Sequence, residues 1–156
     1  MKSVLFVCMG NICRSPTAEG IFQKLVSDAG RDSEFQVDSA GTIGYHAGSM
    51  ADRRMRSAAQ GRGYLLESRA RRIEFADFGR FDLIVTMDDE NFREVQEMHP
   101  GTGALVVRMC DYCEEHDETE VPDPYYGGPS GFERVLDLIE EASEGLLADI
   151  RQQHGL

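Results

Sequence analysis

The sequence contains no tryptophan, five prolines and only four cysteines among its 156 residues. Two of the cysteines belong to one short motif near the start of the chain, so the four do not form the spaced pattern of a secreted disulfide framework. No apolar run approaches the ~20 residues that a membrane-spanning helix requires, and the first residues lack the apolar centre of a signal peptide. These absences predict a cytoplasmic protein without membrane contact.

Basic residues are scarce relative to acidic ones. The chain has 16 lysines and arginines against 28 aspartates and glutamates, which gives a formal net charge of −12 at pH 7. This charge argues against nucleic acid or an anionic membrane as a partner. Half of the basic residues fall between Arg53 and Arg80, whereas residues 111–123 are densely acidic. We interpret the two stretches as solvated faces of opposite charge.

Apolar residues make up 41% of the chain, and their spacing predicts alternating strands and helices. We expect strands at 4–7, 35–39, 83–87 and 105–108, and helices at 16–29, 51–62, 89–98 and about 132–150. This alternation predicts a parallel sheet with right-handed crossovers and helices on both faces. The chain is expected to form a single domain over residues 1–156. The aperiodic stretch 110–131 is expected to be a long functional loop.

The strongest chemical signal is the loop that follows the first expected strand. Its sequence, CMGNICRS, runs from Cys8 to Ser15 and leads into a helix expected to open at Pro16. Backbone N–H groups of such a loop converge on an anion, and Arg14 can add two parallel hydrogen bonds to phosphate-type oxygens. The same positive field favours the thiolate form of Cys8. The motif therefore predicts a sulfur nucleophile aimed at a bound phosphate group.

This Cys-x5-Arg-Ser loop, placed directly after a Val-Leu-Phe-Val strand, resembles that of the low-molecular-weight protein tyrosine phosphatases. Later stretches match further landmarks of the family in the same order, at 37–42 (VDSAGT), 81–88 (FDLIVTMD) and 121–128 (VPDPYYGG). The resemblance covers essentially the whole chain. It implies a three-layer α/β fold whose four-stranded parallel sheet has the order 2-1-3-4. It also implies hydrolysis of phosphotyrosine in proteins, with no cofactor and no metal.

Three residues are expected to carry the chemistry. Cys8 attacks phosphorus to give a cysteinyl-phosphate intermediate, while Arg14 and the loop amides stabilise the charge of the transition state. Asp123, held between two prolines, is the expected general acid and later the general base. An ordinary turn aspartate is the alternative for Asp123. The match to the family's Asp-Pro-Tyr-Tyr sequence favours the acid.

Further residues are expected to bind the substrate or to shape the loop: Met9, Gly10, Asn11, Ile12, Cys13 and Ser15 within the loop, Ser39 after the second strand, and Tyr45, Tyr125 and Tyr126 around the pocket. Gly10 and Asn11 tolerate the positive φ that a tight loop needs. By resemblance, Asn11 bonds to Ser39 and stiffens the loop. By resemblance, the Ser15 hydroxyl contacts the Cys8 sulfur, although capping the first helix is a competing role for the same oxygen.

The three tyrosines are expected to form the walls of a slot for a flat ring, with Ile12 at its rim. A deep aromatic slot favours phosphotyrosine over the shorter phosphoserine. Surface tyrosines without a role in binding are the alternative. In the family the adjacent tyrosines can be phosphorylated, so the resemblance adds a tyrosine kinase to the expected partners. The other partners are phosphotyrosine proteins, with phosphate or other oxyanions as ligands.

The remaining cysteines have separate expected roles. Cys13 lies close enough in the loop to form a reversible disulfide with an oxidised Cys8. Cys110 and Cys113, with His116 nearby, resemble half of a zinc site, but a fourth ligand at a plausible spacing is missing. We therefore expect loop cysteines without a metal.

Three other functions stand as alternatives. Arsenate-reducing relatives carry two further cysteines just after the third strand, where residues 87–93 contain none. Protein arginine phosphatases of the family tend to have threonine at the position of Ile12. A non-catalytic phosphopeptide-binding module would be expected to lose Cys8 or Asp123, and both are present. For a phosphatase, arginines near the pocket are the alternative to a solvated basic face, because they could select phosphopeptides with acidic flanks.

Overall fold

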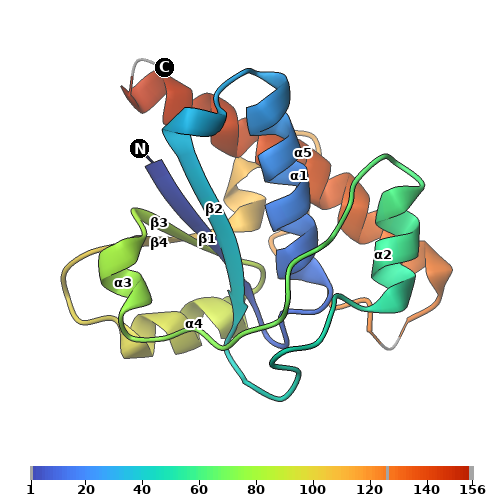
Figure 1. Ribbon diagram of the computed structural model, residues 1–156, viewed down its shortest axis with the longest axis horizontal. Coiled ribbons are helices and arrows are strands. Elements are labelled where there is room, and N and C mark those ends of the chain that lie inside the picture. The colour runs from blue at the N-terminus through green and yellow to red at the C-terminus, as the bar shows by residue number, and fades with distance from the viewer. Residues whose placement is uncertain (1, 126, 155–156) are drawn as a thin grey trace.

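The computed structural model describes residues 2–125 and 127–154. At its centre lies a four-stranded sheet in the order β2-β1-β3-β4, and every pair of neighbouring strands is parallel (Figure 1). The strands are β1 (Lys2–Cys8), β2 (Phe35–Gly41), β3 (Leu83–Thr86) and β4 (Leu105–Arg108). The predicted fold class and strand order are confirmed.

Helices cover both faces of the sheet, as predicted (Figure 1). They are α1 (Arg14–Asp28), α2 (Arg53–Gln60), α3 (Asp77–Arg80), α4 (Asp89–Met98) and α5 (Pro129–His154), with the short 3₁₀ turns η1 (Asp32–Glu34) and η2 (Met109–Tyr112). One face packs against α1 and α5, and the other packs against α3 and α4. The fold therefore has three layers.

The residues of β1 alternate between the two layers. Phe6 points toward α1, where its ring centroid lies 5.6 Å from that of Phe22. Leu5 packs in the opposite cluster with Ile84 and Phe78. These side chains are fully buried, and burying a residue of this size contributes about 1.5–3 kcal/mol. Burial on both faces explains why β1 has a continuous apolar sequence instead of an alternating one.

Several element boundaries differ from the sequence-based expectations. β1 extends to Lys2 and Cys8, beyond the expected 4–7, because it pairs along its length with β2. The first helix begins at Arg14, so Pro16 occupies its third position and the expected opening at Pro16 is wrong by two residues. The second helix is shorter than expected, because the Asp52 carboxylate accepts hydrogen bonds from the backbone N–H groups of Arg54 and Met55 and fixes its start.

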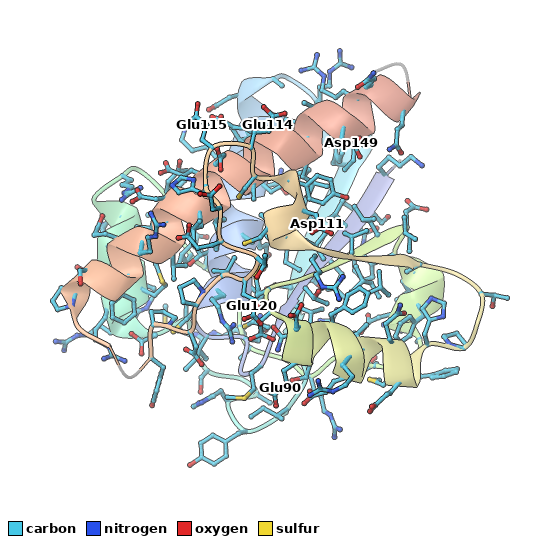
Figure 2. The ribbon with its side chains drawn as sticks, turned by 180° about the vertical axis from the view of Figure 1, so that it is seen from behind. Glu90, Asp111, Glu114, Glu115, Glu120 and Asp149 are labelled. Carbon is cyan, nitrogen blue, oxygen red and sulfur yellow. The ribbon has the colours of Figure 1, made fainter. Side chains whose placement is uncertain are left out.

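The expected loop at 110–131 is wrong at both ends. It begins inside η2, and α5 begins at Pro129. The short helix α3 was not predicted, because four residues are too few to show a helical period. From η2 to the start of α5, the acidic side chains of Asp111, Glu114, Glu115 and Glu120 are exposed on the side seen in Figure 2.

Across residues 2–125 and 127–154, no helix combines the length and the apolar character needed to span a bilayer.

The turn between α4 and β4 contains two glycines with different surroundings, and these allow a matched test. Gly101 and Gly103 both have positive φ, of 92° and 97°. A Cβ atom at Gly101 would meet open space, whereas at Gly103 it would lie 2.2 Å from the Phe78 carbonyl oxygen. Gly101→Ala should lower the free energy of unfolding by about 1 kcal/mol, the cost of a left-handed alanine.

Gly103→Ala should cost about 3 kcal/mol or more, because a clash with backbone adds to the same strain. Urea unfolding of both variants measures the difference. Equal losses of unfolding free energy in the two variants would mean that α3 shifts away from residue 103 without destabilising the fold.

Candidate active site

The loop that follows β1 is anchored from outside through its carbonyl groups. The Cys8 and Met9 carbonyls accept hydrogen bonds from the N–H groups of Thr42 (2.9 Å) and Ile43 (3.1 Å), and the Ile12 carbonyl accepts one from Asp52 (2.7 Å). In a trans peptide the next N–H points away from the carbonyl. The N–H groups that follow these carbonyls therefore face the other side of the loop, and together with the start of α1 they form a cradle for an anion.

Asn11 holds the loop in shape. It adopts a φ of +58°, whereas Gly10, which was also expected to allow this conformation, does not have a positive φ. The Asn11 side-chain amide donates hydrogen bonds to Ser39 Oγ (3.0 Å) and to Ser15 Oγ (2.7 Å). The predicted bond between Asn11 and Ser39 is present. Ser39 in turn donates to the carboxylate of Glu19 (2.5 Å).

Ser15 contacts the sulfur of Cys8. Its Oγ lies 3.0 Å from Cys8 Sγ, and the helix N-cap position belongs to Cys13, so the capping role for Ser15 is wrong. Ser15 Oγ accepts a hydrogen bond from Asn11, and its own proton has two acceptors within reach, the Cys8 sulfur at 3.0 Å and the Ala40 carbonyl at 3.4 Å. A hydroxyl that donates to sulfur stabilises the thiolate.

Cys13 lies in a different environment from Cys8, although both are buried. Burial, with a further contribution from the nearby Asp52 carboxylate, raises the pKa of Cys13 above its ordinary value. Cys13 is therefore a protonated thiol at neutral pH.

Arg14 is almost completely buried at the first position of α1. Its Nη1 donates hydrogen bonds to Asp88 Oδ2 (2.6 Å) and to the Val121 carbonyl (3.1 Å). Burial by itself would lower the pKa of Arg14, but the charge of Cys8 and the hydrogen bond to Asp88 outweigh it, so the pKa is raised. The guanidinium is thus held charged and in one orientation.

Asp123 comes to the site from the irregular segment that precedes α5. Its Oδ2 lies 3.7 Å from Arg14 Nη2, and its Oδ1 accepts a hydrogen bond from the Tyr125 N–H at 3.0 Å. The same segment is tied to the sheet by Val121, whose N–H donates to the Met87 carbonyl at 2.8 Å. About a third of the Asp123 side chain is exposed, so the carboxyl can meet both a substrate and water.

These groups line one cavity of about 330 Å³. Nine of the predicted site residues line it: Cys8, Met9, Gly10, Ile12, Cys13, Arg14, Tyr45, Asp123 and Tyr125. Asn11, Ser15 and Ser39 do not line the cavity; their buried side chains hydrogen-bond to one another and support the loop. Tyr126 lies outside the described residues.

The pocket wall differs in part from the expected aromatic slot. Tyr45 is 85% exposed and Tyr125 is 36% exposed, so both stand at the mouth of the cavity. Ile12 is only 8% exposed and therefore lines the wall instead of the rim. The His46 ring lies between the two tyrosines in ring contacts, 4.8 Å from the Tyr45 centroid and 6.4 Å from that of Tyr125.

Sequence reasoning missed Ile43, His46, Asp88 and Glu19. Ile43 and His46 flank Tyr45 closely in the sequence, but no chemical motif distinguishes them. Asp88 could have been found, because it follows β3 and the carboxyl ends of parallel strands meet at one edge. It also caps α4 by accepting a hydrogen bond from the Asn91 N–H.

Cys110, Cys113 and His116 are the residues that resemble half of a zinc site. Burial raises the pKa of Cys110 to about 11 and that of Cys113 to about 12, so both thiols are protonated at neutral pH. His116 Nδ1 lies 2.8 Å from Glu141 Oε1, and this contact lowers the pKa of Glu141 to about 2. Within residues 2–125 and 127–154, no group of three or more His, Cys, Asp or Glu side chains is arranged so that it could hold a metal ion.

The cavity thus combines a sulfur, a buried guanidinium, a backbone cradle and a carboxyl. Comparison with known proteins identifies a family for the chain as a whole. Residues 3–155 match a family described as low molecular weight phosphotyrosine protein phosphatase. A protein of Streptomyces coelicolor named low molecular weight protein-tyrosine-phosphatase is 42% identical over 154 residues, which cover 96% of this chain and 94% of that protein.

Human low molecular weight phosphotyrosine protein phosphatase is 40% identical over 136 residues, 86% of each chain. Among solved structures, a protein tyrosine phosphatase from Entamoeba histolytica with Hepes in its active site superposes with a TM-score of 0.94. It is 42% identical and covers 99% of both chains.

Proposed function

The chain belongs to the low molecular weight phosphotyrosine protein phosphatase family, and we propose that it hydrolyses phosphotyrosine in proteins with Cys8 as the nucleophile. The observation that carries this proposal is the meeting of Cys8, Arg14 and Asp123 in one cavity beside an anion cradle. The family match supports the phosphatase activity, and the geometry of the cavity supports the role of each residue.

In the first step the Cys8 thiolate attacks phosphorus, so that an S–P bond forms while the bond from phosphorus to the phenolic oxygen breaks. Arg14 and the loop N–H groups bind the remaining phosphate oxygens, where charge gathers in the transition state. Asp123 is the general acid of this step and gives a proton to the departing phenolate. The exposure of Asp123 at the mouth of the cavity suits contact with that oxygen.

In the second step the Asp123 carboxylate takes a proton from water. The resulting oxygen nucleophile attacks phosphorus, and the S–P bond breaks to release phosphate and the Cys8 thiolate. The Ser15 hydroxyl, 3.0 Å from Cys8 Sγ, stabilises the sulfur both as nucleophile and as leaving group. Inorganic phosphate and other oxyanions should bind the same cradle.

The mouth of the cavity supports phosphotyrosine over phosphoserine. Its aromatic side chains Tyr45, Tyr125 and His46 offer ring contacts to a phenyl group that carries the phosphate down to Cys8. Ile12 supplies an apolar wall where a phosphoarginine substrate would gain no polar partner. Rates on phosphotyrosine, phosphoserine, phosphoarginine and arsenate, measured side by side, test this choice directly.

Cys8→Ser should abolish turnover of aryl phosphates, because a serine hydroxyl is not ionised at neutral pH. The fold and the affinity for inorganic phosphate should remain largely intact, since the cradle is unchanged. The matched control is Cys13→Ser, which removes a neighbouring thiol and should keep substantial activity. Steady-state turnover and phosphate binding measure both effects, and residual activity of even about a per cent in Cys8→Ser would contradict the nucleophile.

Asp123→Asn should impair the enzyme most when the leaving group is poorest. A phenolate with a pKa near 10 needs a proton in the transition state, whereas an acidic nitrophenol needs much less. We expect losses on the order of 10²–10⁴-fold for the poor leaving groups. A series of aryl phosphates measured with both enzymes checks this. Losses of equal size across the series would mean that Asp123 only positions its segment.

We further propose that Cys13 protects the enzyme from oxidation. Peroxide oxidises the Cys8 thiolate to a sulfenic acid, and the Cys13 sulfur then displaces water to form a disulfide that an external thiol reduces. Peroxide-treated wild type should regain most activity with reductant, and Cys13→Ser should regain much less. Because the pKa of Cys13 is raised by burial, formation of the Cys8–Cys13 disulfide after removal of peroxide should accelerate as the pH rises. Equal recovery of both enzymes would leave Cys13 as a packing residue.

A further inference from the structure

The segment around Arg71 runs along the end of β2 and contacts the phosphate-binding loop. The Arg71 carbonyl accepts a hydrogen bond from the Gly41 N–H, and the Ile73 N–H donates to the Gly41 carbonyl, both at 2.8 Å. The Arg71 N–H points the other way and donates to Asn11 Oδ1 at 3.0 Å. A single residue thus joins the edge of the sheet to the loop.

Asn11 Oδ1 is the acceptor end of the side chain that shapes the loop. Asn11 is 2% exposed, so water does not replace a lost partner for this oxygen. Its amide nitrogen holds Ser15, and Ser15 Oγ lies 3.0 Å from the Cys8 sulfur. A continuous path of hydrogen bonds therefore leads from the backbone of Arg71 to the nucleophile.

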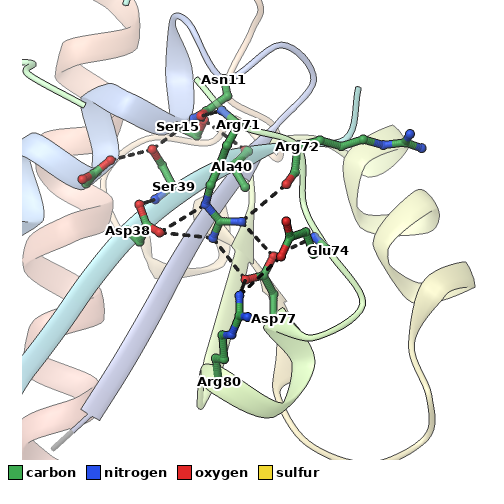
Figure 3. Close-up of polar contacts among 11 residues, drawn as sticks. Asn11, Ser15, Asp38, Ser39, Ala40, Arg71, Arg72, Glu74, Asp77 and Arg80 are labelled. Carbon is green, nitrogen blue, oxygen red and sulfur yellow. Dashed lines mark hydrogen bonds and ion pairs between the residues drawn. The ribbon is translucent and has the colours of Figure 1, made fainter. Parts of the chain in front are cut away.

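The Arg71 side chain fixes where that backbone lies. Its guanidinium makes paired contacts with two carboxylates, at 3.2 and 3.1 Å to Asp38 Oδ2 and at 3.0 and 3.1 Å to the two oxygens of Asp77 (Figure 3). Asp38 belongs to β2 and Asp77 begins α3. A planar guanidinium held on two sides cannot turn without breaking these bonds.

Asp77 is the less replaceable of the two carboxylates. It is fully buried, and it also accepts a hydrogen bond from the Glu74 N–H at 2.7 Å. The exposed Arg80 lies 3.8 Å from Asp77 and is not bonded to the loop. A buried carboxylate without a partner is strongly unfavourable, so the ion pair with Arg71 ties α3 to the segment that holds Asn11.

We propose that Arg71 is a positioning residue for the phosphate-binding loop, and that Asp77 acts through it. By clamping Arg71 between β2 and α3, the two carboxylates fix the N–H that keeps Asn11 in its left-handed conformation. This inference rests on the proposed function for its kinetic readout, and on phosphate binding for a second readout that needs no turnover.

The test compares Asp77→Asn with Arg80→Ala. The first variant keeps the shape of the side chain but removes the charge that holds Arg71. The second removes the exposed arginine that contacts Asp77 at 3.8 Å and Glu74 at 3.4 Å. Asp77→Asn should lower kcat about tenfold and weaken the binding of inorganic phosphate by a similar factor. KM should rise by no more than the loss of phosphate affinity. Arg80→Ala should stay within about twofold of the wild type.

A double-mutant cycle with Asn11→Ala separates positioning from general stability. If Asp77 acts through Asn11, adding Asp77→Asn to Asn11→Ala should lower kcat little further, because the path is already broken. If the double variant instead loses kcat by the product of the two single-variant factors, the proposal is wrong. Arg71→Lys can replace Asp77→Asn in the same cycle, since a lysine keeps the charge but cannot hydrogen-bond to both carboxylates in the same way.

Val95→Ala serves as the stability control. Val95 is fully buried on the same face of the sheet as α3 but is not bonded to the loop. It should lower the thermal midpoint without lowering kcat. If Val95→Ala and Asp77→Asn lose kcat in proportion to their midpoints, Arg71 is an ordinary stabilising residue and the proposal is wrong.

Phosphate affinity also separates the two proposals. A wild type that binds phosphate without hydrolysing phosphotyrosine would contradict the proposed function. The positioning role of Arg71 would then be decided by the phosphate affinities of the same variants.

Discussion

Parallel pairing of β1 with β2 on one side and β3 on the other determines where the loop after β1 and the residues that support it lie. The register places Cys8 beside Gly41 and Val7 beside Thr86. Since parallel strands end at the same edge, the loop after β1, the end of β2 and the residues after β3 meet there. Burial of β1 on both faces fixes this register, because a slip by one residue would exchange its two apolar faces and leave Cys8 out of place.

Arg14 already has acidic partners before a substrate arrives. Arg14 faces Asp88 at 2.6 Å, Asp123 at 3.7 Å and the sulfur of Cys8, so one guanidinium is shared among several acidic groups. The chain as a whole carries a net charge of −12, which repels a phosphate dianion at long range. Recognition must therefore come from short-range contacts with Arg14, the loop N–H groups and the start of α1. Salt should screen the long-range repulsion and leave these contacts in place.

Features that depend on local sequence were predictable, and those that depend on distant contacts were not. The strands, the loop from Cys8 to Ser15 and the long C-terminal helix follow from periodicity and from the spacing of a thiol and an arginine. The contact between Arg71 and Asn11 joins residues 60 positions apart and involves a backbone N–H, which leaves no mark in the sequence. The choice between two roles for Ser15 required the start of α1 at Arg14, because a shift of two residues decides which atom its hydroxyl reaches.

The sheet divides the apolar core into two compartments of different size. The larger one contains Cys8 and Cys13 with α1 and α5, and the smaller one contains Phe78 and Val95 with α3 and α4. Proteins open locally in roughly contiguous cooperative units, and regions with few buried apolar contacts open at the lower free energies. We therefore expect the smaller compartment to open first. Opening of the α3 side releases Asp77 while Cys8 stays packed among α1 and α5. Heating should then inactivate the enzyme reversibly at temperatures where most of its backbone is still folded.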